Sequence, residues 1–160
     1  MLANSTVLLI RHAEKPDSGK GLSSMGQARA DGYAAYFPNL PIHPQGHYDH
    51  LYASKDSEES HRPELTLTPL AHALDMKVET PHLDKHYAKL ADDLLNPSKD
   101  YSNENIVICW HHGEILNLAN LLLEKNPPSD LPTKWPGDVF GWLLWISYDA
   151  KEKPTLTIYR

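Results

Sequence analysis

Short hydrophobic runs alternate with helical patterns along most of the chain, and this alternation predicts an α/β fold. The runs Thr6–Ile10 and Ile106–Trp110 are almost wholly apolar, without polar alternation. Such runs are typical of strands covered on both faces, as in a parallel sheet. His50–Ser54 is expected to form a third strand and Met76–Glu79 a weaker fourth. The sequence therefore predicts a mostly parallel central sheet.

Helical spacing and two aromatic runs complete the predicted order of elements. Ser23 is expected to cap a helix that extends to about Phe37. Further helices are expected at Pro63–Leu74, Leu83–Leu95 and Glu114–Glu124, and C-terminal strands at Phe140–Ser147 and Thr155–Ile158. Pro69, inside the second helix, is a possible kink. The C-terminal strands are predicted to add an antiparallel element to the sheet.

Composition narrows the classes of protein and partner. The 160 residues, 41% of them hydrophobic, are enough for one core, so residues 1–160 are expected to form a single domain. The net charge of −6 is scattered and leaves no basic stripe for nucleic acid. The N-terminal apolar run is too short for a signal peptide or a membrane span. A lone cysteine, Cys109, favours a reducing compartment, so we expect a cytoplasmic protein without a membrane or nucleic-acid partner. The sequence leaves the oligomeric state open.

Two of the predicted buried strands end in histidine. The first continues into Arg11 and His12, and the run Ile106–Trp110 continues into His111 and His112. Ligands of open α/β sheets bind beyond the carboxyl ends of the strands. If these strands are neighbours, their histidines face each other across one cleft.

A pocket rich in arginine and histidine suits a dianionic phosphate. A guanidinium binds two phosphate oxygens through its fork of N–H groups. A neutral imidazole nitrogen can attack phosphorus and form a phosphohistidine, while fixed cations stabilise the transition state. This chemistry requires neither a metal nor another cofactor.

Four short motifs occur in an order that resembles one known family. They are LLIRHAE at Leu8–Glu14, GLSSMGQARA at Gly21–Ala30, RPELTLTPLA at Arg62–Ala71, and His112-Gly113 after a buried strand. Together they resemble the histidine phosphatase superfamily, also called phosphoglycerate mutase-like, over nearly the whole chain. The resemblance implies a three-layer helix/sheet/helix fold and a phosphatase that works through a covalent phosphohistidine.

The resemblance also implies roles for individual residues. His12 would be the nucleophile, Arg11 and Arg62 would hold the phosphoryl oxygens, and His112 would add a hydrogen bond or positive charge. His112 is preferred because the family histidine directly precedes the glycine, and adjacent residues of an extended segment point to opposite sides. His111 is then expected either to support the site from behind the contact residues or to be packed away from it.

Two residues close to His12 complete the set of expectations. Glu14 is expected to support the loop after the first strand. Lys15 is either a cation of the substrate pocket or a solvated side chain.

The proton donor to the leaving group has two candidates. Asp84 lies 22 residues after Arg62, near the position of a catalytic glutamate in many family members. Glu114 follows His112 by two residues, where another branch of the family carries its acid. Each has a structural alternative, Asp84 as a helix cap and Glu114 as a first-turn carboxylate. A third possibility is that no dedicated acid exists, which a good leaving group would tolerate.

Two intervals depart from the family pattern. The acidic connection between Ser54 and Arg62 is longer than usual and either reshapes the pocket rim or is simply solvated. Only 50 residues separate Arg62 from His112, which leaves no room for the insertions that cap mutase pockets. A mutase is therefore disfavoured, and the size resembles short phosphohistidine phosphatases. The expected substrate is a phosphoprotein or a phosphorylated small molecule.

Two other functions compete with a phosphatase. His82, Asp84 and His86 have the spacing of ligands on one helix face, and His43, His47 and His50 share a loop, so a metal-dependent hydrolase is an alternative. The other alternative is a noncatalytic module that binds phosphate or a phosphoprotein. Neither a nucleophile nor an arginine is missing, which favours catalysis.

Overall fold

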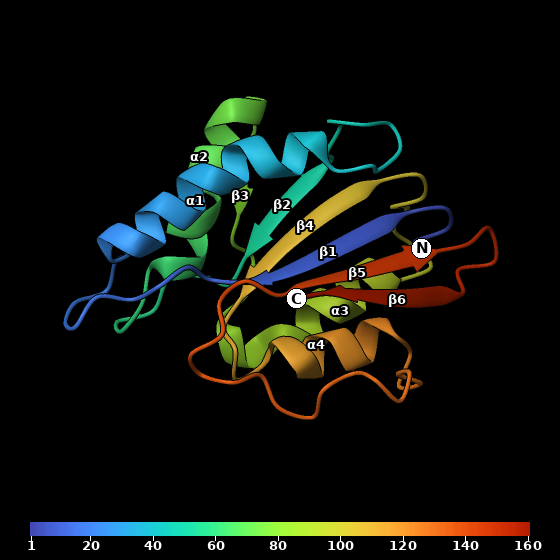
Figure 1. Cartoon of the computed structure of the whole chain (residues 1–160). Helices are drawn as coiled ribbons and strands as arrows, with labels where there is room; N and C mark the ends of the chain where they lie inside the picture. Colours follow the sequence, from blue (N-terminus) through green and yellow to red (C-terminus); the bar gives the residue numbers. More distant parts are fainter.

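The computed structural model describes residues 1–160 as a six-stranded sheet between two pairs of helices (Figure 1). The strands are β1 (Thr6–Arg11), β2 (His50–Ala53), β3 (Val78–Glu79), β4 (Asn105–Trp110), β5 (Leu143–Tyr148) and β6 (Pro154–Tyr159). The helices are α1 (Ser24–Tyr36), α2 (Arg62–Leu74), α3 (Tyr87–Leu95) and α4 (Ile115–Leu122), with 3-10 turns at Phe37–Asn39 and Asp84–His86. The strand order is β3-β2-β4-β1-β5-β6, parallel from β3 to β1 and antiparallel across β5 and β6. The predicted fold class is confirmed.

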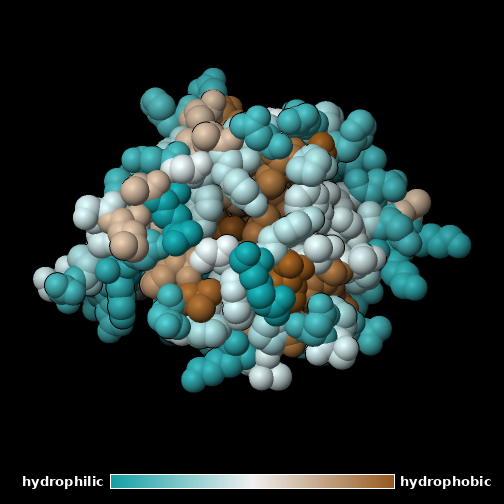
Figure 2. Space-filling view, in the orientation of Figure 1, coloured by the Kyte–Doolittle hydropathy of each residue, from teal (hydrophilic) through white to brown (hydrophobic).

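The sheet separates two hydrophobic layers, with α1 and α2 on one face and α3 and α4 on the other (Figure 1). Along β1, Leu8 and Ile10 pack on the α1/α2 side and Val7 and Leu9 on the α3/α4 side. β1 and β4 are therefore buried on both faces, as their apolar runs predict. Figure 2 shows hydrophobic atoms reaching the surface at the centre of the view, between the upper and the lower pair of helices. None of the helices is long and apolar enough to cross a membrane.

The helix predicted at Pro63–Leu74 is confirmed as α2, with Pro69 inside it. Two other details differ from the sequence predictions. The segment Asp84–His86 is a 3-10 turn, and α3 begins only at Tyr87. Phe140 precedes β5, which begins at Leu143, and its ring packs against the Arg11 guanidinium, with Arg11 Cζ 3.8 Å from the ring centroid.

Gly26 allows α1 to approach the loop that follows β1. Ser23 caps α1 by accepting a hydrogen bond from the Gly26 amide, and the Ser23 amide donates to the Glu14 carbonyl. A Cβ at Gly26 would overlap the Glu14 carbonyl oxygen and lie 2.9 Å from its backbone nitrogen. Gly26→Ala is therefore expected to lower the free energy of unfolding by about 1–3 kcal/mol, measured by urea denaturation.

Gly32→Ala is the matched control, because Gly32 lies in the same helix and its Cβ would meet no atom within 4 Å. This variant is expected to raise stability by about 0.5–1 kcal/mol through helix propensity. Equal effects of the two substitutions would contradict the proposed close packing at Gly26.

Candidate active site

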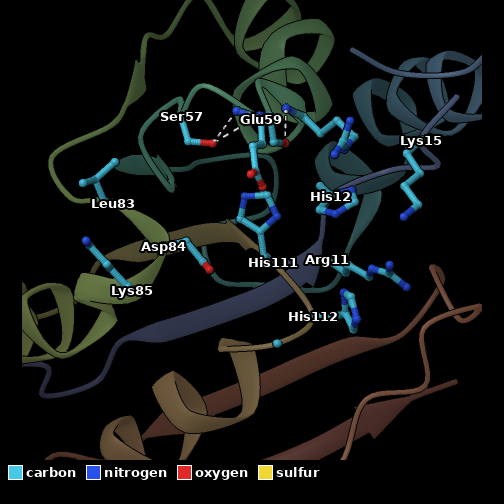
Figure 3. A pocket seen from close by; sticks show the side chains of 13 residues that line it. Arg11, His12, Lys15, Ser57, Glu59, Leu83, Asp84, Lys85, His111 and His112 are labelled. Carbon is cyan, nitrogen blue, oxygen red and sulfur yellow. Dashed lines mark hydrogen bonds between the residues drawn. The ribbon is translucent and has the colours of Figure 1, made fainter. Parts of the chain in front are cut away.

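A cleft of about 550 Å³ opens where the carboxyl ends of β1, β2 and β4 meet (Figure 3). Thirteen residues line it, and Leu83 is the only hydrophobic one. Six of the seven residues proposed from the sequence are among them: Arg11, His12, Lys15, Arg62, Asp84 and His112. Although the chain carries a net charge of −6, four arginine and lysine side chains line this cleft, so its local charge favours anions.

His12 is held in one orientation by its own backbone. Its Nδ1 lies 2.7 Å from the Ala13 carbonyl oxygen, so Nδ1 carries the proton and Nε2 keeps its lone pair. Burial lowers the pKa of His12 to about 3, and the charges of Arg11 and Arg62 act in the same direction against the Ala13 hydrogen bond. The imidazole is therefore neutral at physiological pH, as a nucleophile must be.

Side chains from α1 and α2 fix the loop that carries His12. The Ala13 amide donates to Thr66 Oγ1 over 2.8 Å, and the Thr66 hydroxyl donates to the Arg62 carbonyl over 2.7 Å. Glu14 forms an ion pair with Arg29 of α1. Glu14 thus supports the loop as expected, whereas Thr66 was not assigned a role, although it belongs to the Arg62–Ala71 motif.

The Arg11 side chain contacts the loop before β5 and also lines the cleft. Its Nη1 donates to the carbonyls of Gly137 and Val139 at 2.8 and 2.9 Å, while Nε is buried without a partner. Burial lowers the pKa of Arg11 to about 10, which leaves the guanidinium charged at neutral pH. The side chain therefore anchors one wall of the cleft and retains N–H donors for a ligand.

Arg62, at the start of α2, repeats this arrangement. Its Nη1 donates to the carbonyls of Gly19 and Gly21 at 3.1 and 3.4 Å, and its Nε is buried without a partner. An unpaired buried donor costs about 1–3 kcal/mol. The two arginines together therefore favour an oxyanion that accepts from their unused N–H groups.

The position of His111 corrects the sequence prediction. The parallel pairing of β1 with β4 places Arg11 opposite Trp110, so the following residues His12 and His111 come side by side. Their ring centroids are 5.0 Å apart, and burial lowers the pKa of His111 to about 4. His111 is therefore not packed away from the site but lines the cleft next to His12. His112 also lines the cleft, beside Arg11 and more exposed (Figure 3).

The two candidate acids occupy different environments. Asp84 lines the cleft, its Oδ1 is buried without a partner, and burial, followed by the charge of Glu114, raises its pKa to about 6. Glu114 does not line the cleft and accepts a hydrogen bond from Asn117 over 2.8 Å. Neither carboxylate forms a helix cap through its side chain. The geometry favours Asp84 as the acid, because a Glu114 proton would be released outside the cleft.

The histidines whose spacing in the sequence resembles that of metal ligands do not form a common site. His82 Nε2 pairs with Asp93 over 2.9 Å, and the 3-10 turn removes the helical register expected to align it with His86. The structure groups no three histidine, cysteine or acidic side chains that could hold a metal ion. Lys15 lines the cleft and forms no ion pair, so its charge is available to a ligand.

Comparison by sequence matches neither a family profile nor an individual curated protein. Comparison by structure gives clear matches that span nearly the whole chain. A phosphoglycerate mutase from Plasmodium falciparum superposes with a TM-score of 0.63 at 16% identity, covering 98% of this chain and 91% of the mutase. The chain has the histidine phosphatase fold.

Two phosphatases share this histidine phosphatase fold. The protein histidine phosphatase SixA, complexed with tungstate, has a TM-score of 0.62 at 16% identity, covering 95% of this chain and 94% of SixA. A variant of phosphoserine phosphatase from Entamoeba histolytica, in complex with phosphoserine, has a TM-score of 0.56 at 17% identity, covering 96% of this chain and 95% of that protein. The histidine phosphatase fold thus carries both mutases and phosphatases, and the cleft residues must decide between them.

Proposed function

We propose that this protein is a metal-independent phosphatase that forms a covalent phosphohistidine on His12. The observation that carries the proposal is the neutral His12 with its Nε2 lone pair free, set between two arginines whose Nε atoms lack partners. This combination supplies a nucleophile and a cationic cradle for phosphate without a metal. The phosphatases that share the fold support phosphatase activity in general.

In the first step, His12 Nε2 attacks phosphorus as the bond to the leaving oxygen breaks. Arg11 and Arg62 hold the nonbridging oxygens, and His111 adds an N–H donor from the adjacent strand end. Asp84, protonated below its raised pKa, gives its proton to the leaving oxygen. The leaving group departs as an alcohol or a neutral nitrogen base.

In the second step, water attacks the phosphohistidine, and the ionised Asp84 accepts the proton that the water releases. The N–P bond breaks, phosphate leaves, and His12 and Asp84 return to their starting states. The open cleft favours release to water over transfer to a retained intermediate, so we propose hydrolysis rather than mutase activity. Its substrates are phosphomonoesters or phosphohistidine, on a small molecule or on a protein.

Hydrolysis is expected to persist after dialysis against EDTA, because imidazole and guanidinium groups supply the required chemistry. The measurement is phosphate release from a panel of phosphomonoesters and a phosphohistidine protein, with and without chelator. Activity that needs an added divalent metal would overturn the metal-independent mechanism. Phosphate binding without turnover would instead support the noncatalytic binding module.

The pH profile is expected to identify Asp84 as the acid. For an alkyl phosphate, kcat/KM should be highest between about 3, where His12 becomes neutral, and about 6, where Asp84 ionises. As pH rises through about 6, Asp84 loses the proton that it must donate, and the rate falls. Ionisation of the substrate changes the rate of the wild type and of Asp84→Asn in the same way. Apart from this shared change, the rate of Asp84→Asn should not fall as pH rises through this range. Identical profiles would remove Asp84 from the proton transfer.

A further inference from the structure

Trp110, the last residue of β4, links this strand to the segment His82–Asp84 through a hydrogen bond. We propose that Trp110 is the positioning residue for the proton donor, acting through the backbone of Asp84 rather than on the substrate. The proposal rests on the proposed function, in which Asp84 protonates the leaving group. It gives a role to a buried indole that the phosphatase mechanism does not otherwise use.

The contact is a hydrogen bond from the indole to a main-chain carbonyl. Trp110 Nε1 donates to the Asp84 carbonyl oxygen over 3.1 Å. Trp110 is the last residue of β4, is 0% exposed, and belongs to the hydrophobic cluster formed with α3 and α4. A side chain enclosed in this way has little rotational freedom, so its N–H is a fixed point for the segment that it holds.

The backbone contact matters for Asp84 because no hydrogen bond holds its carboxyl group in place. The Oδ1 atom is buried without a hydrogen-bond partner. A second hydrogen bond holds this segment two residues earlier, where the Lys55 amide, just after β2, donates to the His82 carbonyl over 2.7 Å. The segment is therefore fixed at His82 from β2 and at Asp84 from β4. In Figure 3, Asp84 and His12 appear on opposite sides of His111.

The position of Asp84 matters most when the leaving oxygen is basic. An alkoxide must be protonated as its bond to phosphorus breaks, whereas nitrophenolate departs without help. Loss of the indole N–H would leave the Asp84 carbonyl unpaired and let the segment shift. Rates with alkyl phosphates should then fall more than rates with p-nitrophenyl phosphate. A purely structural defect would lower both rates by the same factor.

The test compares kcat/KM for glycerol 2-phosphate and p-nitrophenyl phosphate in four variants and the wild type. Asp84→Asn is expected to lose about 10²-fold on the alkyl ester and far less on the aryl ester. Trp110→Phe should lose about 10-fold on the alkyl ester with the same selectivity, and the double variant should be no worse than Asp84→Asn alone.

Trp135→Phe is the control: Trp135 is 1% exposed and donates Nε1–H to the Val139 carbonyl over 2.8 Å, in the loop held by Arg11. Its losses on the two esters should be equal.

The outcomes separate this inference from the proposed function. Equal losses on both esters in Trp110→Phe, with selective loss in Asp84→Asn, would overturn the role of Trp110 and leave the acid assignment intact. Equal losses in Asp84→Asn would overturn the acid assignment and this inference together. A wild-type protein that hydrolyses neither ester nor phosphohistidine would overturn the proposed function.

If Trp110→Phe fails to fold, Trp110→3-benzothienylalanine removes the N–H and keeps the shape of the ring. Selective loss on the alkyl ester in that protein supports the proposal, and wild-type selectivity overturns it.

Discussion

His12→Ala is expected to lower phosphatase turnover by about 10⁴-fold or more, because the substitution removes the nitrogen that is proposed to form the covalent intermediate. In the wild type, rapid quenching with ³²P-labelled substrate should trap a phosphoenzyme. That phosphoenzyme should be lost in acid and survive alkali, as a phosphohistidine does and a phosphoserine does not. The variant should show no trapped label.

His72→Ala serves as the matched control, since His72 is exposed on α2 and lies outside the cleft. It should retain both turnover and the trapped label. A His12→Ala protein that hydrolyses phosphomonoesters at the wild-type rate would eliminate the covalent mechanism. Label that survives acid would place the phosphoryl group on a residue other than histidine.

Arg62→Met is expected to lower kcat/KM by about 10²–10³-fold, the usual effect of removing one preorganised donor from a charged transition state. The substitution removes a buried Nε and a positive charge from the cleft lining, while a methionine fills a similar length along α2. Steady-state kinetics with p-nitrophenyl phosphate, and competition by inorganic phosphate, measure the loss of turnover and of oxyanion affinity separately.

Arg160→Met is the control for this substitution, because Arg160 stacks on Trp142 with Cζ 5.3 Å from the ring centroid and is not part of the cleft. It should leave both measurements unchanged. If the two variants behave alike, Arg62 does not hold the phosphoryl group. A loss confined to folding would appear as a lower urea midpoint in Arg62→Met.

The strand ends could be predicted from the sequence because their pattern has a single physical explanation. A run such as Val7–Ile10 without polar alternation must be buried on both faces, and in a parallel sheet its carboxyl end meets those of its neighbours. This places Arg11 and His12 beside the end of β4. The antiparallel C-terminal element was predicted from the same alternation of elements, whereas the order of the six strands is known only from the structure.

The register between β1 and β4 could not be predicted from the sequence. It depends on which backbone hydrogen bonds form across the two strands, and a shift by one residue exchanges the faces of the sheet. The pairing of Arg11 with Trp110 makes His111, rather than His112, the neighbour of His12. The glycine that follows His112 carries no information about this register.

The different environments of the two candidate acids could not be predicted from the sequence either. Asp84 and Glu114 both lie near the start of a helical segment. They are close enough to each other for the charge of Glu114 to raise the pKa of Asp84. Their difference lies in which surface each faces, and this depends on how α3 and α4 pack on the sheet. The single link from Trp110 to Asp84 is a contact between residues 26 positions apart, which periodicity does not reveal.

The hydrophilic lining of the cleft determines how a ligand gains its binding energy. Small-molecule sites are mostly apolar, whereas Leu83 is the only hydrophobic side chain among the thirteen that surround this one. The carbon stems of the long charged side chains remain part of the cleft surface, so a ligand that enters contacts polar head groups and apolar area together. The attraction for an anion comes from the charged head groups, and salt screens this attraction over a Debye length of about 8 Å at physiological ionic strength. An anionic ligand is therefore expected to bind this cleft less tightly as the salt concentration rises.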